Sequence, residues 1–362
     1  MQKAGDIIRN MGKGTRSVAK TTEQVLAEAT ASFAAKRAAS AQLEISKPAP
    51  TTKEISLPEK LLEAAVSIRE RQPLTSELAF MAKNLIQVTL PHSDPGDVPL
   101  WTRTNGDLTL VIARTGVDDD GKPIGYPYGV IPRLLLYWIT SEAVRNKNRT
   151  DINPRVLELG QNLSEFMRDV GLQPVQGGGK RSDARRLKDQ MNRLFSSSIG
   201  FQYSRKSEGL IGQSSLGMLI APRRELWWDP RNLAQGNLWQ SWIELGQDFY
   251  DAIIASAVPV DVRALKGLRK SPLALDLYGW ATHKTFSLYK QNQTQFIGYK
   301  DFMRQFGTDY NDPKNFKKKL HTALKKVQAV YPQLKIRSED GGLTIYPSRT
   351  AVPRNVNPMK LS

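Results

Sequence analysis

Residues 165–171 have the sequence Glu-Phe-Met-Arg-Asp-Val-Gly, and residues 301–307 have the sequence Asp-Phe-Met-Arg-Gln-Phe-Gly. Four of these positions are identical, a fifth is acidic in both copies, and the offset between the copies is 136 residues. Each copy is followed by a turn and then by a basic segment with helical periodicity. Because a fixed offset that carries the same order of elements indicates an internal repeat, the sequence predicts two duplicated domains.

The same order of elements is predicted around each copy: an apolar helix, a short strand, a short helix, a turn, a long basic helix and a β-hairpin. This order is typical of a winged helix-turn-helix, in which the long helix enters the DNA major groove. The first set is predicted at residues 130–147, 156–159, 163–171 and 182–198, with strands at 200–206 and 217–228 around a Gly- and Ser-rich loop. The second set is predicted at residues 273–288, 296–297, 299–307 and 312–330, with strands at 334–337 and 343–346.

The segments outside these sets complete the predicted organisation. A helix is expected at 59–71, and Asn105-Gly106 predicts a type I′ hairpin between strands at 100–104 and 107–114. Residues 1–58, rich in Ala, Ser, Thr and Lys, predict a flexible basic tail with one Ala-rich helix near 22–39. The expected fold class is α+β, with two tandem winged helix-turn-helix domains and a disordered basic N-terminal tail. The predicted boundaries are a tail at 1–58, a first winged-helix domain with N-terminal helix and hairpin additions at 59–245, a second at 246–350 and a C-terminal tail at 351–362.

Charge indicates the partner. The 362 residues contain 52 Lys and Arg against 35 Asp and Glu, a net charge of +17. Such an excess attracts polyanions, and release of condensed counterions would drive binding to nucleic acid. An anionic membrane surface, or a basic protein without a specific acidic partner, are the alternatives. Residues 180–193 and 312–331 together carry +9 of the total.

The two long basic helices are the predicted DNA-contacting elements. Each has an apolar stripe, formed in the first by Leu187, Met191 and their neighbours and in the second by residues such as Leu320. The remaining faces carry charges of nearly one sign, which repel one another unless a polyanion is present. Arg and Asn suit base edges and Lys suits phosphates, so we expect the first helix to contribute more to sequence recognition. The predicted DNA-binding residues are Arg168, Arg181, Arg185, Arg186, Lys188, Asn192 and Arg193 in the first unit, and Arg304, Lys314, Lys317, Lys318, Lys319 and Lys325 in the second.

Catalytic and cofactor chemistry finds little support in the sequence. The chain has no cysteine, which excludes disulfides, thiol nucleophiles and iron–sulfur sites. No Gly-x-x-x-x-Gly-Lys-[Ser/Thr] motif is present, and His92, His283 and His321 are scattered singly. Asp118-Asp119-Asp120 is interpreted as an acidic turn. We therefore expect no cofactor, no metal and no enzymatic activity. With no apolar run of about 18 residues and no secretory signal, we expect a cytoplasmic protein that does not enter membranes.

Four segments resemble the plasmid-encoded RepA replication-initiator family, which includes iteron-binding initiators. They are Tyr-Pro-Tyr-Gly-Val-Ile-Pro-Arg at 126–133 with the following Leu-Leu-Leu-Tyr-Trp, Leu-Ser-Glu-Phe-Met-Arg at 163–168, Arg-Leu-Phe-Ser-Ser-Ser at 193–198 and Ser-Pro-Leu-Ala-Leu-Asp-Leu-Tyr at 271–278. The resemblance covers roughly residues 74–350. It implies tandem winged helices that bind directly repeated double-stranded DNA sites at a plasmid origin in a bacterial cytoplasm, open adjacent DNA and control copy number. It also implies recruitment of the host replicative helicase and host initiator protein, and a monomer–dimer balance.

Two alternatives remain open at this point. A winged-helix repressor of its own operon would bind DNA in the same way without opening an origin. A strand-nicking replication enzyme belongs to another class and would cleave supercoiled plasmid in the presence of Mg²⁺.

Overall fold

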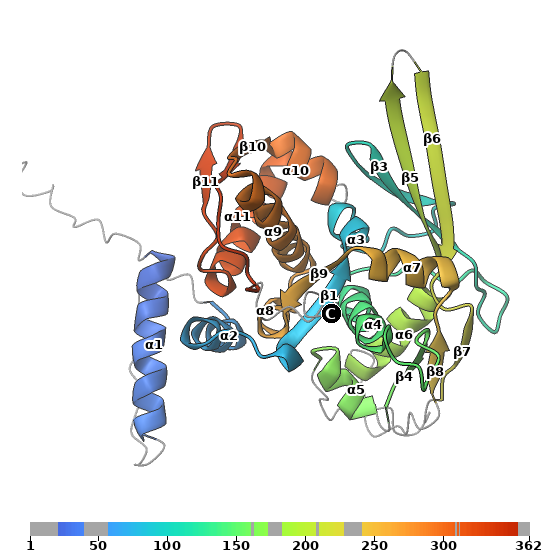
Figure 1. Cartoon of the computed structure of the whole chain (residues 1–362), viewed down its shortest axis with the longest axis horizontal. Helices are drawn as coiled ribbons and strands as arrows, with labels where there is room; N and C mark the ends of the chain where they lie inside the picture. Colours follow the sequence, from blue (N-terminus) through green and yellow to red (C-terminus); the bar gives the residue numbers. More distant parts are fainter. Residues whose placement is uncertain are drawn as a thin grey trace, which may run out of the picture. The chain divides into compact units, whose positions relative to one another are not determined.

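We analysed a computed structural model of the chain, which describes residues 21–39, 57–160, 163–172, 183–207, 210–227, 241–307, 310 and 312–353. By its contacts the chain divides into residues 1–58 and residues 59–362. The first part contains helix α1 (Thr22–Ala39), so the helix predicted within the tail is confirmed (Figure 1). Residues 1–20 and 40–56 lie outside the described residues, and the predicted flexibility of the tail stays a prediction.

The first half of the second part contains most of the elements expected from its sequence. Its apolar helix, short strand, short helix and basic helix all form, each within a few residues of the predicted bounds. The elements are α2 (Glu59–Glu70), β1 (Leu78–Ala82), α3 (Lys83–Gln87), β2 (Trp101–Asn105), β3 (Leu108–Arg114), α4 (Val130–Asn146), β4 (Val156–Glu158), α5 (Leu163–Asp169), α6 (Asp183–Phe195), β5 (Ser197–Ser207), β6 (Leu210–Leu219), β7 (Arg223–Glu225) and β8 (Trp242–Glu244).

In the second half the order of apolar helix, short strand, short helix, basic helix and hairpin recurs, which confirms the α+β class and the predicted elements at 273–346. Its apolar helix α9 is capped by Ser271, whose side chain accepts a hydrogen bond from the backbone N–H of Ala274, and begins with Pro272. The elements are α7 (Gln247–Ala255), β9 (Ala257–Asp261), α8 (Val262–Leu268), α9 (Pro272–Gln291), β10 (Gln295–Gly298), α10 (Tyr299–Phe306), α11 (Pro313–Val330), β11 (Ile336–Glu339) and β12 (Gly342–Ile345).

One aromatic contact occurs in both halves and connects the repeated sequence to the packing. Trp138 of α4 lies edge-on to Phe166 of α5, with ring centroids 5.0 Å apart. Trp280 of α9 lies in the same way against Phe302 of α10, at 5.1 Å. Both phenylalanines come from the repeated Phe-Met-Arg sequence and are buried. The repeat therefore preserves the contact that fixes each short helix on its apolar helix.

The two halves join through strands that the sequence analysis did not predict. β1 and β9 form a two-stranded antiparallel sheet, with Leu78 opposite Asp261 and Ala82 opposite Ala257. Side chains of the two apolar helices bind backbone N–H groups of this sheet. The Ser141 hydroxyl accepts from the N–H of Phe80 at 2.8 Å, and the Tyr278 hydroxyl accepts from the N–H of Asp261 at 3.1 Å. Each apolar helix is thus fastened to the strand of its own half.

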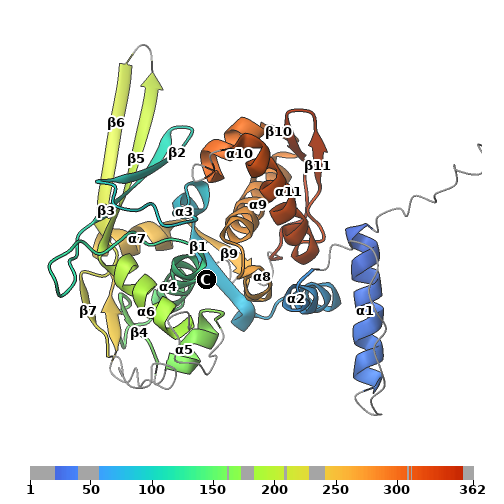
Figure 2. The same cartoon turned by 180° about the vertical axis from the view of Figure 1, so that it is seen from behind.

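The helices that precede β1 and β9 are exchanged between the halves. α2 comes before β1 in sequence but packs on α8 and α11 of the second half (Figures 1 and 2). α7 comes before β9 but packs on α4 and β1 of the first half. Through this exchange the described parts of the two halves interlock, because α2 and α7 each pack on the half other than their own. The predicted boundary between residues 245 and 246 stays a prediction.

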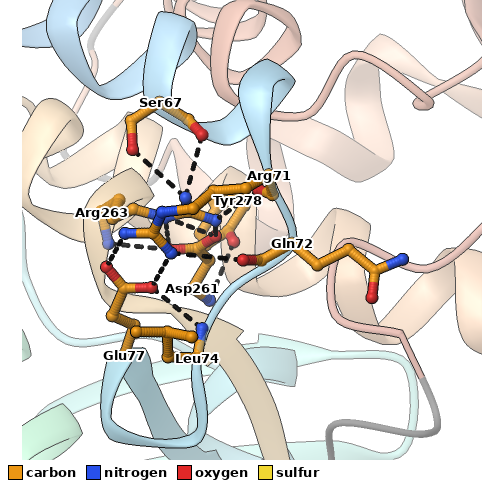
Figure 3. Close-up of polar contacts among 8 residues, drawn as sticks. All are labelled: Ser67, Arg71, Gln72, Leu74, Glu77, Asp261, Arg263 and Tyr278. Atoms are coloured by element: carbon orange, nitrogen blue, oxygen red, sulfur yellow. Dashed lines mark hydrogen bonds and ion pairs between the residues drawn. The ribbon is translucent and has the colours of Figure 1, made fainter.

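A network of arginine contacts fastens α2 to the second half (Figure 3). Arg263 donates to both carboxylate oxygens of Asp261, to the carbonyl and hydroxyl oxygens of Ser67, and to the Arg71 carbonyl. Arg71 in turn donates to both oxygens of Glu77, and the N–H of Leu74 donates to the same carboxylate. The Arg71 hydrogen bond is the main reason why the pKa of Glu77 falls to about 2. The network therefore holds the end of α2 and the entry to β1 against α8.

A buried ion pair joins α4 to α9. Arg133 is 3% exposed, and its Nε and Nη2 atoms donate to the two carboxylate oxygens of Asp276 at 2.7 and 2.8 Å. The same guanidinium donates to the carbonyls of Leu90, Pro91 and Gly129, and His92 Nε2 lies 2.8 Å from Asp276. Burial alone would raise the pKa of Asp276, but the positive charge of Arg133 and these hydrogen bonds hold it well below its usual range. Burial lowers the pKa of His92, so the neutral ring donates Nε2–H to the carboxylate.

The sheets differ from the sequence prediction in the first half. β5 pairs with β6 from Ser198 to Ser207, and β3 pairs with β5. The hairpin at 101–114 and the hairpin after α6 therefore form one four-stranded sheet in the order β2-β3-β5-β6. The predicted loop between residues 206 and 217 is wrong, because Gly212 to Leu216 are paired in β6. Gly and Ser have low strand propensity, and pairing with β5 overrides it here.

The turn of the first hairpin is also different from the type I′ turn expected at Asn105-Gly106. Asn105 pairs with Leu108, so Gly106 and Asp107 are the central residues. Gly106 has a φ of 58°, whereas Asp107 is not among the residues with positive φ. A type I′ turn requires positive φ at both central residues, and this turn has it only at the first, where glycine carries no steric cost.

We predict that Asp276→Ala destabilises the protein by about 3–5 kcal/mol, because it leaves the Arg133 guanidinium buried without its carboxylate. Asp151→Ala is the matched control, since Asp151 pairs with Arg149 on the surface with its side chain 64% exposed, and exposed pairs contribute about 0–1 kcal/mol. Urea unfolding of both variants measures the difference. Equal losses would show that the buried pair does not hold the halves together.

The same pair gives stability a defined pH dependence. The folded pKa of Asp276 lies below its unfolded value, so its contribution is fully present above about pH 4 and is lost as the pH falls through the folded pKa.

Candidate nucleic-acid interface

The basic helix α6 is amphipathic as predicted. Its buried face contains Leu187, Met191 and Leu194, each fully enclosed, together with Ala184 and Phe195. Because these residues recur at spacings of three and four, the remaining positions are turned away from the core. Ser182, the expected N-cap, lies outside the described residues, and so does Arg181.

The basic side chains of α6 differ in accessibility. Arg185 and Arg186 are exposed, whereas Lys188 and Asn192 are half-buried. Arg186 forms a surface ion pair with Asp183 one turn earlier, at 3.2 Å. Such exposed pairs are weak and exchange readily for another anion. Arg185 and Arg186 are therefore the α6 residues whose charge is most accessible to a phosphate or a base.

Arg193 forms several ion pairs and hydrogen bonds within the protein, which its position in the sequence did not suggest. Its side chain is 19% exposed and forms ion pairs with Asp189 on α6 and with Asp94 in the segment before β2, at 3.0 and 3.1 Å. It also donates to the Tyr126 carbonyl and lies 5.2 Å from the centre of the Tyr128 ring. Burial alone would lower the pKa of Arg193, but the two carboxylates raise it. Arg193 thus fastens α6 to residues 94–128, and its predicted DNA contact stays a prediction.

Arg224 is a supporting residue that the sequence analysis missed. From β7 its guanidinium donates to the carbonyls of Phe195 and Ala221 and to the Ser196 hydroxyl, at 2.9–3.2 Å. The last carbonyls of a helix carry partial negative charge, so a cation at this position stabilises the end of α6. Spacing alone could not have identified it, because nearly thirty residues separate it from the helix end.

The second basic helix, α11, presents more accessible charge than α6. Asp312 caps it by accepting from the N–H groups of Lys314 and Asn315, and Pro313 occupies its first turn. Its buried stripe, which includes Phe316, Leu320 and Val327, packs on α9, α2 and α8. The predicted contact residues on this helix are all exposed: Lys314, Lys317, Lys318, Lys319 and Lys325.

The arginines of the two repeated Phe-Met-Arg sequences lie in equivalent positions. Arg168 on α5 and Arg304 on α10 are both exposed, while the preceding phenylalanines are in the core. Arg304 forms an exposed ion pair with Asp301 at 3.4 Å. Each arginine therefore lies on the outer side of the short helix that precedes its basic helix.

The histidines occupy three separate environments. His92 binds Asp276, His283 is half-buried on α9, and His321 on α11 lies 3.0 Å from the Tyr299 hydroxyl. Over the described residues, no three His, Asp or Glu side chains are grouped so that they could hold a metal ion. In the same part of the chain, no helix has the length and apolar character needed to cross a membrane.

The described geometry is that of an α+β protein with two repeated sets of elements, each with a basic amphipathic helix at its surface. Residues 126–301 match the family model described as "Plasmid encoded RepA protein". The resemblance predicted from the sequence is thereby confirmed, and the match supports a role as a plasmid replication initiator. It also favours a non-enzymatic, DNA-binding role.

Solved structures similar to this chain include two of the RctB protein. A crystal structure of the RctB domains 2-3 is 11% identical in sequence, covers 73% of this chain and 95% of its own, and has a TM-score of 0.41. A selenomethionine derivative of domains 2 and 3 of RctB is also 11% identical, covers 72% and 95%, and has a TM-score of 0.42. The comparison with curated proteins found no match.

We predict opposite roles for two arginines on α6. Arg193→Gln should lower the free energy of unfolding by about 1–3 kcal/mol, because Asp189, Asp94 and the Tyr126 carbonyl lose a charged donor. Arg185→Gln should change it by no more than about 0.5 kcal/mol, since its side chain is exposed. Urea denaturation of the pair, which matches in charge change and helix, measures the difference. A loss for Arg185→Gln as large as that for Arg193→Gln would contradict the assignment.

Proposed function

We propose that this protein is a plasmid replication initiator that binds directly repeated double-stranded DNA sites at its origin through two tandem winged helix-turn-helix units. In this proposal α6 and α11 enter successive major grooves, and the hairpins β5–β6 and β11–β12 are the wings. Binding promotes opening of adjacent DNA and recruits the host replicative helicase and host initiator protein. The observation that carries the proposal is the family match over a segment that contains the first basic helix and the start of the second repeat.

The distribution of charge supports DNA as the partner. The five exposed lysines of α11 and the exposed arginines of α6 lie at equivalent places in the repeated order of elements. Lysines contact phosphates without regard to sequence, whereas arginine pairs with guanine edges. We therefore assign sequence recognition mainly to α6, with Arg185 as its leading residue, and backbone binding mainly to α11.

Two different basic helices in one chain favour direct repeats over an inverted operator. An ordinary dimeric repressor places two identical helices about a two-fold axis, so its operator is palindromic. Here Arg185 and Arg186 in one unit correspond to a lysine-rich surface in the other, so the two contacted sequences need not be related. A monomer can then occupy one non-palindromic site, and successive monomers can occupy successive copies.

The test is hydroxyl-radical footprinting on the DNA that flanks this protein's own gene, combined with a light-scattering mass of the complex. We expect each monomer to protect about two helical turns, near 20 bp, because grooves on one face of the duplex recur every ~10–10.5 bp. Protection of a single turn would show that only one unit binds DNA. An inverted repeat occupied by a dimer, without direct repeats nearby, would favour the repressor, and Mg²⁺-dependent strand cleavage would favour the nicking enzyme.

We predict a steep salt dependence. If six to ten phosphates are neutralised, affinity should fall ~10³–10⁵-fold between 50 and 200 mM salt. Replacing Lys317, Lys318 and Lys319 together with Gln should reduce the slope of log K against log salt by about three. Lys122→Gln is the control, because Lys122 is 76% exposed in the turn before α4 and lies outside both basic helices. A flat salt response of the wild-type protein would contradict the proposal.

A further inference from the structure

Tyr299 connects three parts of the second repeat. It is the first residue of α10, and its backbone N–H donates to the Gly341 carbonyl in the turn of the β11–β12 hairpin at 2.9 Å. Its hydroxyl lies 3.0 Å from His321 Nε2 on α11 and 3.0 Å from the Ser338 hydroxyl on β11. A single residue of the short helix α10 therefore contacts both the basic helix α11 and the β11–β12 hairpin that follows it.

The ring of Tyr299 also determines the position of a charge. Lys317 Nζ lies 4.4 Å from the ring centre, a distance at which the ring face attracts a cation. The ring lies edge-on to His321 as well, with centroids 5.7 Å apart. Lys317 and His321 are four residues apart on α11, so they occupy neighbouring turns of the same face. Tyr299 thus restrains a lysine side chain that otherwise has many rotamers.

The Tyr299 hydroxyl can form hydrogen bonds to His321 and Ser338 at the same time. A tyrosine hydroxyl has one proton to donate and lone pairs that accept, so it can satisfy His321 and Ser338 together. Burial, with the positive charges of Lys317 and Lys325, lowers the pKa of His321. The imidazole is therefore neutral at pH 7 and can exchange a single hydrogen bond with the hydroxyl.

The first repeat lacks this arrangement. The position 136 residues before Tyr299 is Leu163, which has no hydroxyl. There the hairpin after the basic helix is held instead by pairing of β5 with β3 and by Arg224 at the end of α6. Among the described strands, the β11–β12 hairpin pairs with the four-residue strand β10 alone, and β11 is the outer strand of that sheet. The tyrosine supplies a side-chain connection between that edge and the basic helix.

We propose that Tyr299 is a positioning residue for DNA binding: through Ser338 and His321 it fixes the β11–β12 hairpin relative to α11, and it directs Lys317 toward the phosphate backbone. This inference rests on the proposed function, in which α11 and this hairpin bind one DNA segment together. A helix and a hairpin that are held at a fixed spacing lose less conformational freedom on binding than two independently mobile elements.

The experiment compares Tyr299→Phe with Tyr289→Phe in the full-length protein, on a fragment that carries one origin repeat and on unrelated DNA. Tyr299→Phe keeps the ring beside Lys317 and removes only the bridging hydroxyl. Tyr289 is a matched control because it is 51% exposed on α9. We expect Tyr299→Phe to weaken specific binding about 3- to 10-fold and to lose footprint protection at the flank contacted by the hairpin. Tyr289→Phe should match the wild type in both assays.

A double-mutant cycle with Ser338→Ala tests whether the hydroxyl acts through the hairpin. Ser338 is exposed, so this variant folds if Tyr299→Phe does not. We expect the double variant to bind no more weakly than Tyr299→Phe alone, since both changes remove one shared contact. Additive losses, equal losses on unrelated DNA, or wild-type binding by both single variants would overturn the inference. Absence of specific binding by the wild-type protein would instead contradict the proposed function.

Discussion

The arrangement of the two basic helices depends on the buried ion pair between Arg133 and Asp276. The two residues belong to α4 and α9, the apolar helices at the centre of each half, and each basic helix packs against the apolar helix of its own half. A buried guanidinium must find several acceptors in fixed directions, and Arg133 finds them in one carboxylate and three carbonyls. A slip of α4 along α9 would leave a charge without its partner. The pair therefore specifies one register between the halves, which apolar packing alone would define less strictly.

The elements that periodicity predicts are those whose burial is decided within a single segment. α4, α6, α9 and α11 each contain enough turns for an apolar stripe to be recognised, and the repeated Phe-Met-Arg sequence located α5 and α10. β1 and β9 are five residues long, and a run such as Leu-Ala-Phe-Met-Ala fits a buried strand or a buried helix equally well. Pro259 has no backbone N–H to donate, and β9 accommodates it because both strands of a two-stranded sheet are edge strands. The sequence does not show that α2 and α7 pack on the opposite halves, because both are ordinary amphipathic helices.

The sequence predicts which residues give the candidate interface its charge, but it does not predict which of them form ion pairs within the protein. Sequence alone places Arg185, Arg186 and Arg193 on the outer side of one helix, and it cannot tell which of them meets a carboxylate from elsewhere in the chain. Asp94 is 99 residues away from Arg193, and the Tyr126 carbonyl is 67 residues away. Such contacts are set by the course of residues 91–129 over α6. The same limit applies to Tyr299, whose sequence position suggests only a helix start and whose role comes from three distant partners.

The hairpin after the basic helix is supported in different ways in the two halves. A hairpin that follows a surface helix needs support, because two strands alone are marginally stable in water. In the first half β5 and β6 are eleven and ten residues long and extend a four-stranded sheet, so backbone hydrogen bonds supply the rigidity. In the second half the hairpin strands have four residues each, which is too short for the ladder alone to fix their direction. Side-chain contacts must then supply the rigidity that the short backbone ladder lacks, and this explains why the tyrosine bridge occurs in the second half.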